Sequence, residues 1–291
     1  MKKHVTALIT AWCCLTGLYA TPATPDTEDS SLKVATFNIR YDNSGDGNNR
    51  WAVRKDTVPA LIAAQGWDIV GMQEVLHHQL QDLLQRLPGY RHVGVGRDDG
   101  KTRGEYAPIL YDTLRVRLLD SQTFWLSQYP DSAGFIGWDG ACTRIATWAR
   151  FADKRSGKEF LFVNTHFDHV GKEAMRNAAR LVSQRIKDLA GNRPVILTGD
   201  FNVTADSEPY RILTADPAFL QDVYLKSPSK KGPAYTYHNF GQLPPERRSK
   251  IDFIFASPTI EVLQTGIIRE NADTTGHISD HNPHWGIIRL P

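Results

Sequence analysis

The chain has 291 residues, and 41% of them are hydrophobic, which is ordinary for a globular protein and enough to build one large core. Lys and Arg number 34 against 32 Asp and Glu. This near balance argues against a protein that grips a long nucleic acid through its phosphates, because such proteins usually carry a basic surplus.

Residues 1–20 have the layout of a secretory signal peptide, with two lysines, an apolar stretch that ends at Leu18, and expected cleavage after Ala20. The stretch is too short and too interrupted for a membrane anchor, which needs roughly 20 apolar residues. We therefore expect export to the periplasm or the medium, without stable membrane insertion. Cleavage leaves equal numbers of basic and acidic residues, and leaves Cys142 as the single cysteine, so the mature form has no intramolecular disulfide.

The remaining chain is predicted to form one domain. Residues 21–31 are polar and contain proline, which is typical of a flexible leader. Residues 32–291 contain no stretch that resembles a linker and no internal repeat. We expect this domain to act as a monomer.

Short, β-branched apolar runs recur in chain order and predict strands buried on both faces. They are residues 33–37, 68–72, 92–96, 108–111, 145–151, 160–164, 194–198, 251–255 and 285–290. Apolar residues at helical spacing predict helices over 53–65, 79–87, 173–189 and 208–213. Residues 107–120 and 251–269 each look like two neighbouring strands joined by a short turn. This mixture without strict alternation favours an α/β fold of mixed sheets covered by helices over a purely parallel sheet.

Polar side chains follow several of the predicted strands. Because residues two apart on a strand share a face, such pairs are expected to point into a common cavity. A further carboxylate, Asp252, begins a strand and needs a partner among apolar neighbours. The tail offers His281 for this, beside Asp280. The strand-end residues are Asn38, Glu74, Asn164 with His166, and Asp200 with Asn202.

These residue types predict a metal-dependent phosphoester hydrolase. Carboxylates and amides are hard oxygen ligands that suit Mg²⁺ or Mn²⁺, which keep open positions for phosphate oxygens. His281, paired with Asp252, is positioned to take a proton from water. His166 and the amides would stabilise charge on the pentavalent transition state.

Zinc held by His166, His169, His277 and His281 is disfavoured, because no H-E-x-x-H spacing occurs. A serine-hydrolase triad from Ser279, Asp280 and His281 is disfavoured as well, since adjacent residues cannot form one.

The motifs "TFNIR", "IVGMQEV", "FVNTHFDH", "ILTGDFN", "KIDFIFAS" and "ISDHNP" occur in that order over residues 33–290. In this the chain resembles the endonuclease/exonuclease/phosphatase superfamily, the deoxyribonuclease-like group of phosphoesterases. The resemblance implies a four-layer α/β/β/α sandwich of two mixed β-sheets flanked by helices, with the active site along one end.

The resemblance also implies roles for individual residues. By its position in the motifs, Glu74 resembles the principal metal ligand of the family, with Asn38 and Asp280 near it. Asp200 resembles the residue that positions the nucleophile or a second metal, and Asn202 a phosphate ligand. His166 resembles the histidine at the scissile phosphate, and Asp252 with His281 the Asp/His pair. Whether one metal or two are bound, and whether His281 or Asp200 is the base, stays open.

The substrate is expected to be read by intervening loops, above all residues 123–144. Trp125 and Trp138 lie there among Gly and Pro and are candidates to stack on substrate, and Arg144 could clamp phosphate. Asn164 is a further candidate for substrate contact, and Glu105 for a place behind the metal. We expect a phosphomonoester or phosphodiester on a small molecule or glycan. A secreted nuclease on DNA or RNA, a phospholipase C-like headgroup hydrolase and a non-catalytic phospho-ligand binding protein are the alternatives.

Overall fold

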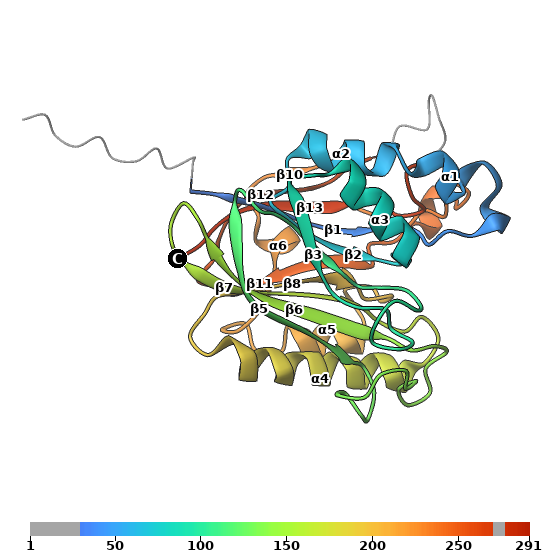
Figure 1. Cartoon of the computed structure of the whole chain (residues 1–291). Coiled ribbons are helices and arrows are strands. Elements are labelled where there is room, and N and C mark those ends of the chain that lie inside the picture. The colour runs from blue at the N-terminus through green and yellow to red at the C-terminus, as the bar shows by residue number, and fades with distance from the viewer. Residues whose placement is uncertain (1–29, 270–276) are drawn as a thin grey trace, which may run out of the picture.

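The computed structural model describes residues 30–269 and 277–291, and these form two β-sheets packed face to face between layers of helices (Figure 1). The predicted signal peptide, residues 1–20, and most of the predicted leader lie outside the described residues. The four-layer sandwich of two mixed sheets is confirmed. Within the described part of the chain, no helix is both long and apolar enough to cross a membrane.

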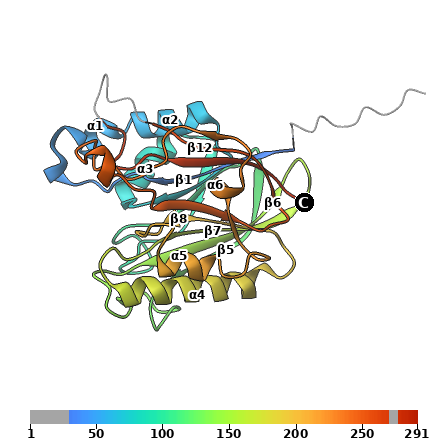
Figure 2. The ribbon, with the colours of Figure 1, turned by 180° about the vertical axis from the view of Figure 1, so that it is seen from behind.

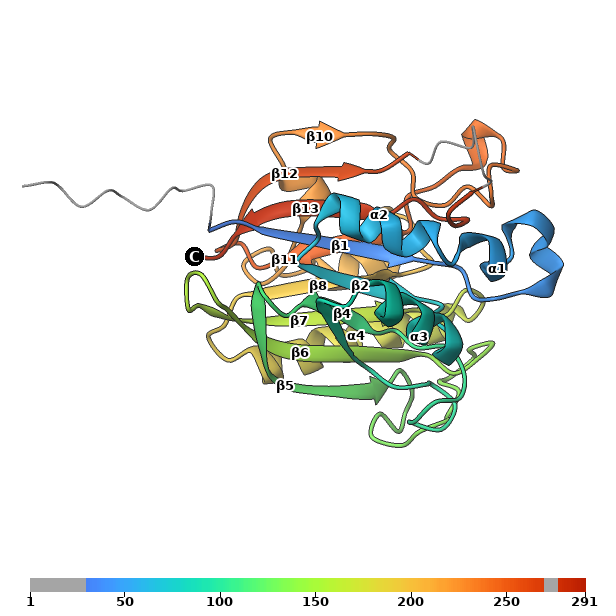
Figure 3. The same cartoon turned by 45° about the horizontal axis from the view of Figure 1, so that its top comes forward.

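The first sheet has the strand order β10-β12-β13-β1-β2-β4-β3, most of which can be followed in Figure 3. Its strands are β10 (Lys230–Lys231), β12 (Glu261–Ile267), β13 (His284–Arg289), β1 (Leu32–Asn38), β2 (Ile69–Gln73), β4 (Ile109–Asp112) and β3 (Tyr90–Val93). The second sheet has the order β5-β6-β7-β8-β11-β9. Its strands are β5 (Val116–Trp125), β6 (Ile145–Asp153), β7 (Glu159–His166), β8 (Val195–Asp200), β11 (Asp252–Ala256) and β9 (Gln221–Asp222).

Helices cover the outer faces of both sheets, as Figures 1 and 2 show from opposite sides. The first sheet carries α1 (Trp51–Arg54), α2 (Thr57–Gln65) and α3 (His77–Arg86), and the second carries α4 (Lys172–Ala190) and α5 (Glu208–Leu213). The short elements are α6 (Val223–Lys226) and the 3₁₀ segments η1 (Ser44–Asn49) and η2 (Pro245–Arg247). The predicted helix over 53–65 is divided into α1 and α2, and α6 was not predicted.

Apolar side chains fill all three spaces between the layers. One cluster joins the inner faces of the sheets through residues such as Val34, Ile69, Phe160 and Ile254. The other two lie beneath the helices of each side. The central strands therefore bury both of their faces, which explains why their sequences are continuous apolar runs rather than alternating ones.

Two predicted strand pairs are wrong in their pairing. The runs over 107–120 and 251–269 do contain two strands each, but β4 and β5 lie in different sheets, and so do β11 and β12. At these two turns the chain crosses from one sheet to the other instead of forming a hairpin. A short turn alone does not distinguish the two outcomes, because facing sheets lie only about 10 Å apart.

The two sheets approach each other closely at Gly71 in β2. A Cβ atom on this glycine would lie 2.1 Å from Thr198 Oγ1 and 2.4 Å from Asn164 Oδ1, side chains of the facing sheet. Asn164 uses the space that the missing side chain leaves, and it donates hydrogen bonds to the carbonyls of Met72 (2.6 Å) and Pro108 (3.0 Å). Asn164 is therefore a polar link between the sheets.

Candidate active site at the strand ends

The register of the second sheet brings three predicted site residues side by side. Asp200, the last residue of β8, lies opposite His166 at the end of parallel β7 and opposite Asp252 at the start of antiparallel β11. From the facing sheet, Asn38 at the end of β1 donates through Nδ2 to Glu74 Oε1 (3.0 Å) and to Asp200 Oδ2 (2.9 Å). Residues distant in the chain thus converge at one end of the sandwich.

A cavity of about 520 Å³ opens at this end, and we call it the polar cavity. Its lining residues are Arg40, Tyr41, Glu74, Arg97, Glu105, Cys142, Arg144, His166, His169, Asp200, Asn202, Tyr237, Ile251, Asp280 and His281. Nearly all of these side chains are charged or polar. Such a wall suits a charged, hydrophilic ligand better than an apolar one.

His281 on the cavity wall and Asp252 behind it form a buried pair. His281 Nδ1 lies 2.9 Å from Asp252 Oδ2, and Nε2 lies 3.8 Å from Asp200 Oδ2. Burial lowers the pKa of His281, but the carboxylates of Asp252 and Asp200 outweigh burial and hold this pKa well above its ordinary value. Burial and the neighbouring Asp252 carboxylate likewise raise the pKa of Asp200. A proton taken up by His281 is therefore stabilised by the carboxylates around it.

The contacts of His166 determine which of its ring nitrogens carries the proton. Asn202 Nδ2 donates to Phe167 O (3.0 Å), which orients the amide, and it also lies 3.1 Å from His166 Nε2. Nε2 is thus an acceptor, and the proton of the neutral ring is on Nδ1, 4.0 Å from Glu105 Oε2. Burial, followed by the charge of Arg144, lowers the pKa of His166 well below its ordinary value, so the ring is neutral.

Oxygen donors on the cavity wall fit a hard divalent cation. The carboxylates of Glu74 and Asp280 both face the guanidinium of Arg40, whose Nη1 lies 3.9 Å from an oxygen of each. Asp200, Asp252 and His281 offer a second set of ligand atoms within 4.8 Å of one another. Asn38 Oδ1 accepts from the Arg40 amide and Nδ2 orients the carboxylates of Glu74 and Asp200, and the role of Asn38 as a metal ligand stays a prediction.

Three of the six non-glycine residues with positive φ in the described part of the chain lie on the cavity wall. Arg40, Glu74 and Asn202 have φ of 58°, 61° and 52°, in the left-handed region that non-glycine residues rarely adopt. Each such residue costs on the order of 1–3 kcal/mol and persists only where surrounding contacts hold it. All three line the polar cavity, so the strained positions point to the same functional site as the side chains do.

Three predicted substrate contacts lie away from the cavity. Asn164 is fully buried, and its Oδ1 accepts from Gln73 (2.7 Å) and Thr198 (3.1 Å). Its polar atoms are occupied, so the predicted role in substrate contact is wrong. Trp125 is buried, and its indole donates to Arg97 O (2.7 Å). Neither Trp125 nor Trp138 is among the lining residues, whereas Arg144 is.

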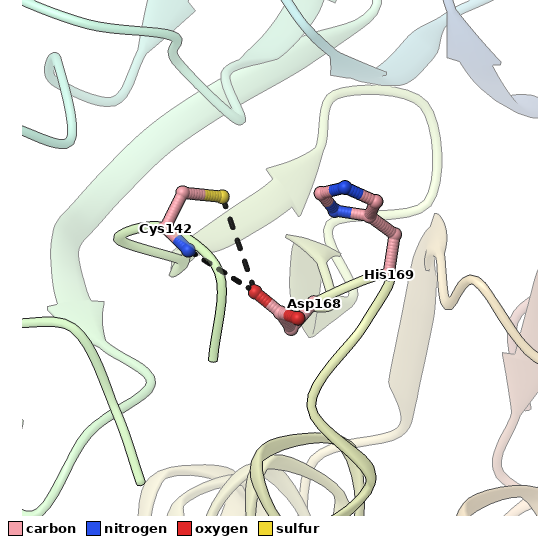
Figure 4. Close-up of side chains that lie close together, drawn as sticks. All are labelled: Cys142, Asp168 and His169. Carbon is pink, nitrogen blue, oxygen red and sulfur yellow. Dashed lines mark hydrogen bonds between the residues drawn. The ribbon is translucent and has the colours of Figure 1, made fainter. Parts of the chain in front are cut away.

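Cys142, Asp168 and His169 lie close together at the edge of the cavity (Figure 4). The oxygens of Asp168 accept from the backbone amides of Ala141, Val170 and Gly171, and Cys142 Sγ lies 3.9 Å from Asp168 Oδ2. Asp168 thereby joins the loop before β6 to the turn before α4, and its lone pairs are engaged. Burial raises the pKa of the Cys142 thiol, which disfavours the thiolate that a nucleophile requires.

The two disfavoured alternatives find no support in the geometry. His277 does not line the polar cavity, and its ring packs 5.4 Å from that of His238. The four histidines considered for zinc therefore do not converge, because His277 lies outside the polar cavity that the other three line. Ser279 is fully buried, and its hydroxyl donates to Asn38 O (2.7 Å), so it is not available as a nucleophile.

Sequence reasoning missed several lining residues. Arg40 belongs to the "TFNIR" motif, two residues after Asn38, so that motif was its available signal. Tyr237 packs its ring 5.0 Å from that of His281, but it lies in a segment without periodicity. Tyr41 and Arg97 also line the cavity, and they follow or precede turns whose paths only the fold reveals. His169, named from the sequence as a candidate zinc ligand, lines the cavity as well.

Comparison with known proteins places these features in a family. The sequence model of the family described as "Endonuclease/Exonuclease/phosphatase family" matches residues 35–281. A Bacteroides vulgatus endonuclease/exonuclease/phosphatase is 50% identical, with a TM-score of 0.87 over 90% of this chain and 99% of that chain. A Bacteroides thetaiotaomicron mannosyl-6-phosphatase is 36% identical, with a TM-score of 0.83 over 89% of this chain and 100% of that chain.

A more distant solved structure shares the fold, and two curated proteins are similar over part of the sequence. Zebrafish TDP2, solved with a single-stranded DNA product, is 21% identical, with a TM-score of 0.70 over 90% of this chain and all of that chain. The Drosophila protein angel is 28% identical over 65% of this chain, and the alignment spans 56% of its own length. An uncharacterized mimivirus protein is 30% identical over 53% of this chain and 59% of its own length, so this chain matches less than two thirds of either curated relative. The chain belongs to the endonuclease/exonuclease/phosphatase family of metal-dependent phosphoester hydrolases.

Proposed function

We propose that this protein is an exported phosphatase that uses Mg²⁺ or Mn²⁺ to remove phosphate from a sugar, either free or at the end of a glycan. The observation that carries the hydrolytic part is the arrangement of Asp200 between two histidines. Its Oδ2 lies 3.8 Å from His281 Nε2 and 3.6 Å from His166 Nε2. The reacting phosphorus is expected in the polar cavity in front of this row.

The chain's own residues account for the steps of in-line hydrolysis. A water oxygen bonds to phosphorus while the bond to the sugar oxygen breaks, and the water proton passes to His281 Nε2. Asp252 stabilises the imidazolium that forms. The departing sugar oxygen takes up a proton from a solvent water, and His281 afterwards returns its proton to solvent. The Nδ1–H of His166 stabilises charge on the transition state, while Asn202 holds the ring in that tautomer through the contact of its amide with Nε2. Asp200 orients the water.

Glu74 and Asp280 are the residues that would hold the metal, with Asn38 orienting Glu74. A divalent cation held there would polarise the phosphate, and its positive charge would lower the pKa of His281 and favour the neutral imidazole that a base requires.

A sugar phosphate is favoured by two observations. The mannosyl-6-phosphatase from Bacteroides thetaiotaomicron is similar over nearly the whole described chain. In addition, Tyr41 and Tyr237 are the only Phe, Tyr or Trp residues on the cavity wall among the residues that the structure describes, and the other side chains there, apart from Ile251, can exchange hydrogen bonds with hydroxyl groups. A nucleobase would need a flat apolar slot between aromatic rings, which the lining residues do not provide.

The test is a panel of substrates with each divalent ion. We expect mannose 6-phosphate to be hydrolysed with Mg²⁺ or Mn²⁺, and EDTA to abolish turnover. Single-stranded DNA, duplex DNA, RNA and phospholipids complete the panel. If a nucleic acid or a phospholipid is cleaved faster than mannose 6-phosphate, that compound is the preferred substrate and the sugar phosphate assignment is wrong. Binding without product at any metal concentration would instead identify a non-catalytic phospho-ligand binding protein.

Export is proposed from the composition of residues 1–20. The check is the N-terminal sequence of the protein recovered from the periplasm or the medium, which should begin at or near Thr21. Recovery of the full-length chain from the cytoplasm would contradict export.

A further inference from the structure

One wall of the polar cavity carries a row of polar contacts that leads away from the reaction centre. The row begins at Asp200, passes to His166 (3.6 Å) and then to Glu105, whose Oε2 lies 4.0 Å from His166 Nδ1. The same Glu105 oxygen lies 3.9 Å from Arg144 Nη1, and Arg144 Nη2 lies 3.1 Å from His169 Nδ1. His169 is thus the far end of the row.

The contact between Arg144 and His169 defines what His169 can offer a ligand. A guanidinium can only donate, so His169 Nδ1 accepts, and the proton of the neutral ring is on Nε2. Arg144 is itself only 6% exposed, and its buried Nε has no hydrogen-bond partner in the described structure. The guanidinium therefore holds the ring in one tautomer and leaves the Nε2–H of His169 as a donor.

The geometry of in-line displacement indicates where the leaving group lies relative to this row of contacts. In-line displacement places the leaving group opposite the attacking water. His166 on β7 and Asp252 on β11 flank Asp200 on β8, and His281 pairs with Asp252, so His281, which takes the water proton, and His166 lie on opposite sides of Asp200. The leaving group therefore departs along the row towards Arg144 and His169.

The row offers donors on Arg144 and His169 and an acceptor on Glu105, a mixture that matches alcohol groups. The charge of Glu105 is balanced by Arg97, 2.7 Å away, and by Arg144. An alkyl chain on the leaving group would leave the donors of Arg144 and His169 unpaired. We propose that His169 is a specificity residue that donates a hydrogen bond to a hydroxyl of the leaving sugar, and that Arg144 positions it. The proposal rests on the sugar phosphatase activity proposed above.

The experiment compares two phosphate esters of primary alcohols, mannose 6-phosphate and butyl phosphate, which differ in the hydroxyl groups of the leaving group. His169→Ala should lower kcat/KM for mannose 6-phosphate roughly five- to tenfold, the size expected for one uncharged hydrogen bond, mainly through KM. Butyl phosphate hydrolysis should be unchanged. His169→Gln, which keeps a donor, should recover part of the loss. His78→Ala, at an exposed histidine outside the cavity, is the matched control.

A double-mutant cycle tests the role of Arg144. If Arg144 acts through His169, then adding His169→Ala to Arg144→Gln should cost mannose 6-phosphate little beyond the single change. Fully additive losses would overturn the positioning role. Equal losses for both esters, or no loss for either, in His169→Ala would overturn the specificity role while leaving the sugar phosphatase activity standing. A wild-type protein that hydrolyses neither ester would overturn that activity and this proposal with it.

Discussion

Replacement of Asp252 by Asn tests the assigned chemistry most directly. The substitution keeps the shape of a side chain that is 1% exposed and removes its charge from His281 Nδ1, 2.9 Å away. With an effective dielectric constant of about 20, a carboxylate whose charge lies about 4 Å from an imidazolium stabilises it by about 4 kcal/mol. Each 1.36 kcal/mol is tenfold in rate, so kcat should fall by roughly a thousandfold.

The assay is steady-state hydrolysis of mannose 6-phosphate at saturating Mg²⁺, with the thermal midpoint measured on the same samples. KM should change little, because Asp252 does not line the polar cavity. Asp222→Asn is the matched control, since Asp222 is another buried carboxylate of the same sheet, engaged with Tyr210 and Lys250 instead of the site. This control should lower stability without a comparable fall in kcat.

The reasoning would be refuted by an Asp252→Asn protein that is folded and retains kcat within about threefold of the wild type, far from the thousandfold loss derived above. Such a result would mean that His281 does not become charged in the transition state. The base would then be sought at Asp200, the other residue that the family resemblance leaves open.

Three further predictions concern the scaffold. Asn164→Ala should destabilise the fold by about 2–4 kcal/mol, since it removes the buried hydrogen bonds that Asn164 makes with Met72, Pro108, Gln73 and Thr198, and a denaturation midpoint equal to wild type would contradict this. Gly71→Ala should destabilise it at least as much, because the new Cβ would collide with Thr198, and an unchanged midpoint would show that the sheets can separate. Burial lowers the pKa of Lys250 to about 8, so the folded state binds fewer protons than the unfolded state between pH 8 and 10.5. Unfolding free energy should therefore rise with pH over that window, and Lys250→Met should flatten the rise in denaturant titrations.

The sequence determined where the central strands lie and which polar residues end them. Strands buried on both faces must be continuous apolar runs, so residues 160–164 and 194–198 were recognisable without knowledge of their partners. Polar residues that break such runs at their carboxyl ends, such as Glu74 and Asp200, therefore predicted a common edge, and the motif order predicted the family.

Only the tertiary structure decided which of these polar side chains reach the cavity. Asn164 and His166 lie two residues apart on the same strand and share a face, yet Asn164 lies beneath Gly71 of the facing sheet while His166 lines the opening. The two residues differ in how closely the facing sheet approaches them, and the local sequence pattern does not show this distance. For the same reason, the sheet to which β5 and β12 belong, and the arrival of His169 beside Arg144, depend on packing between segments far apart in the chain.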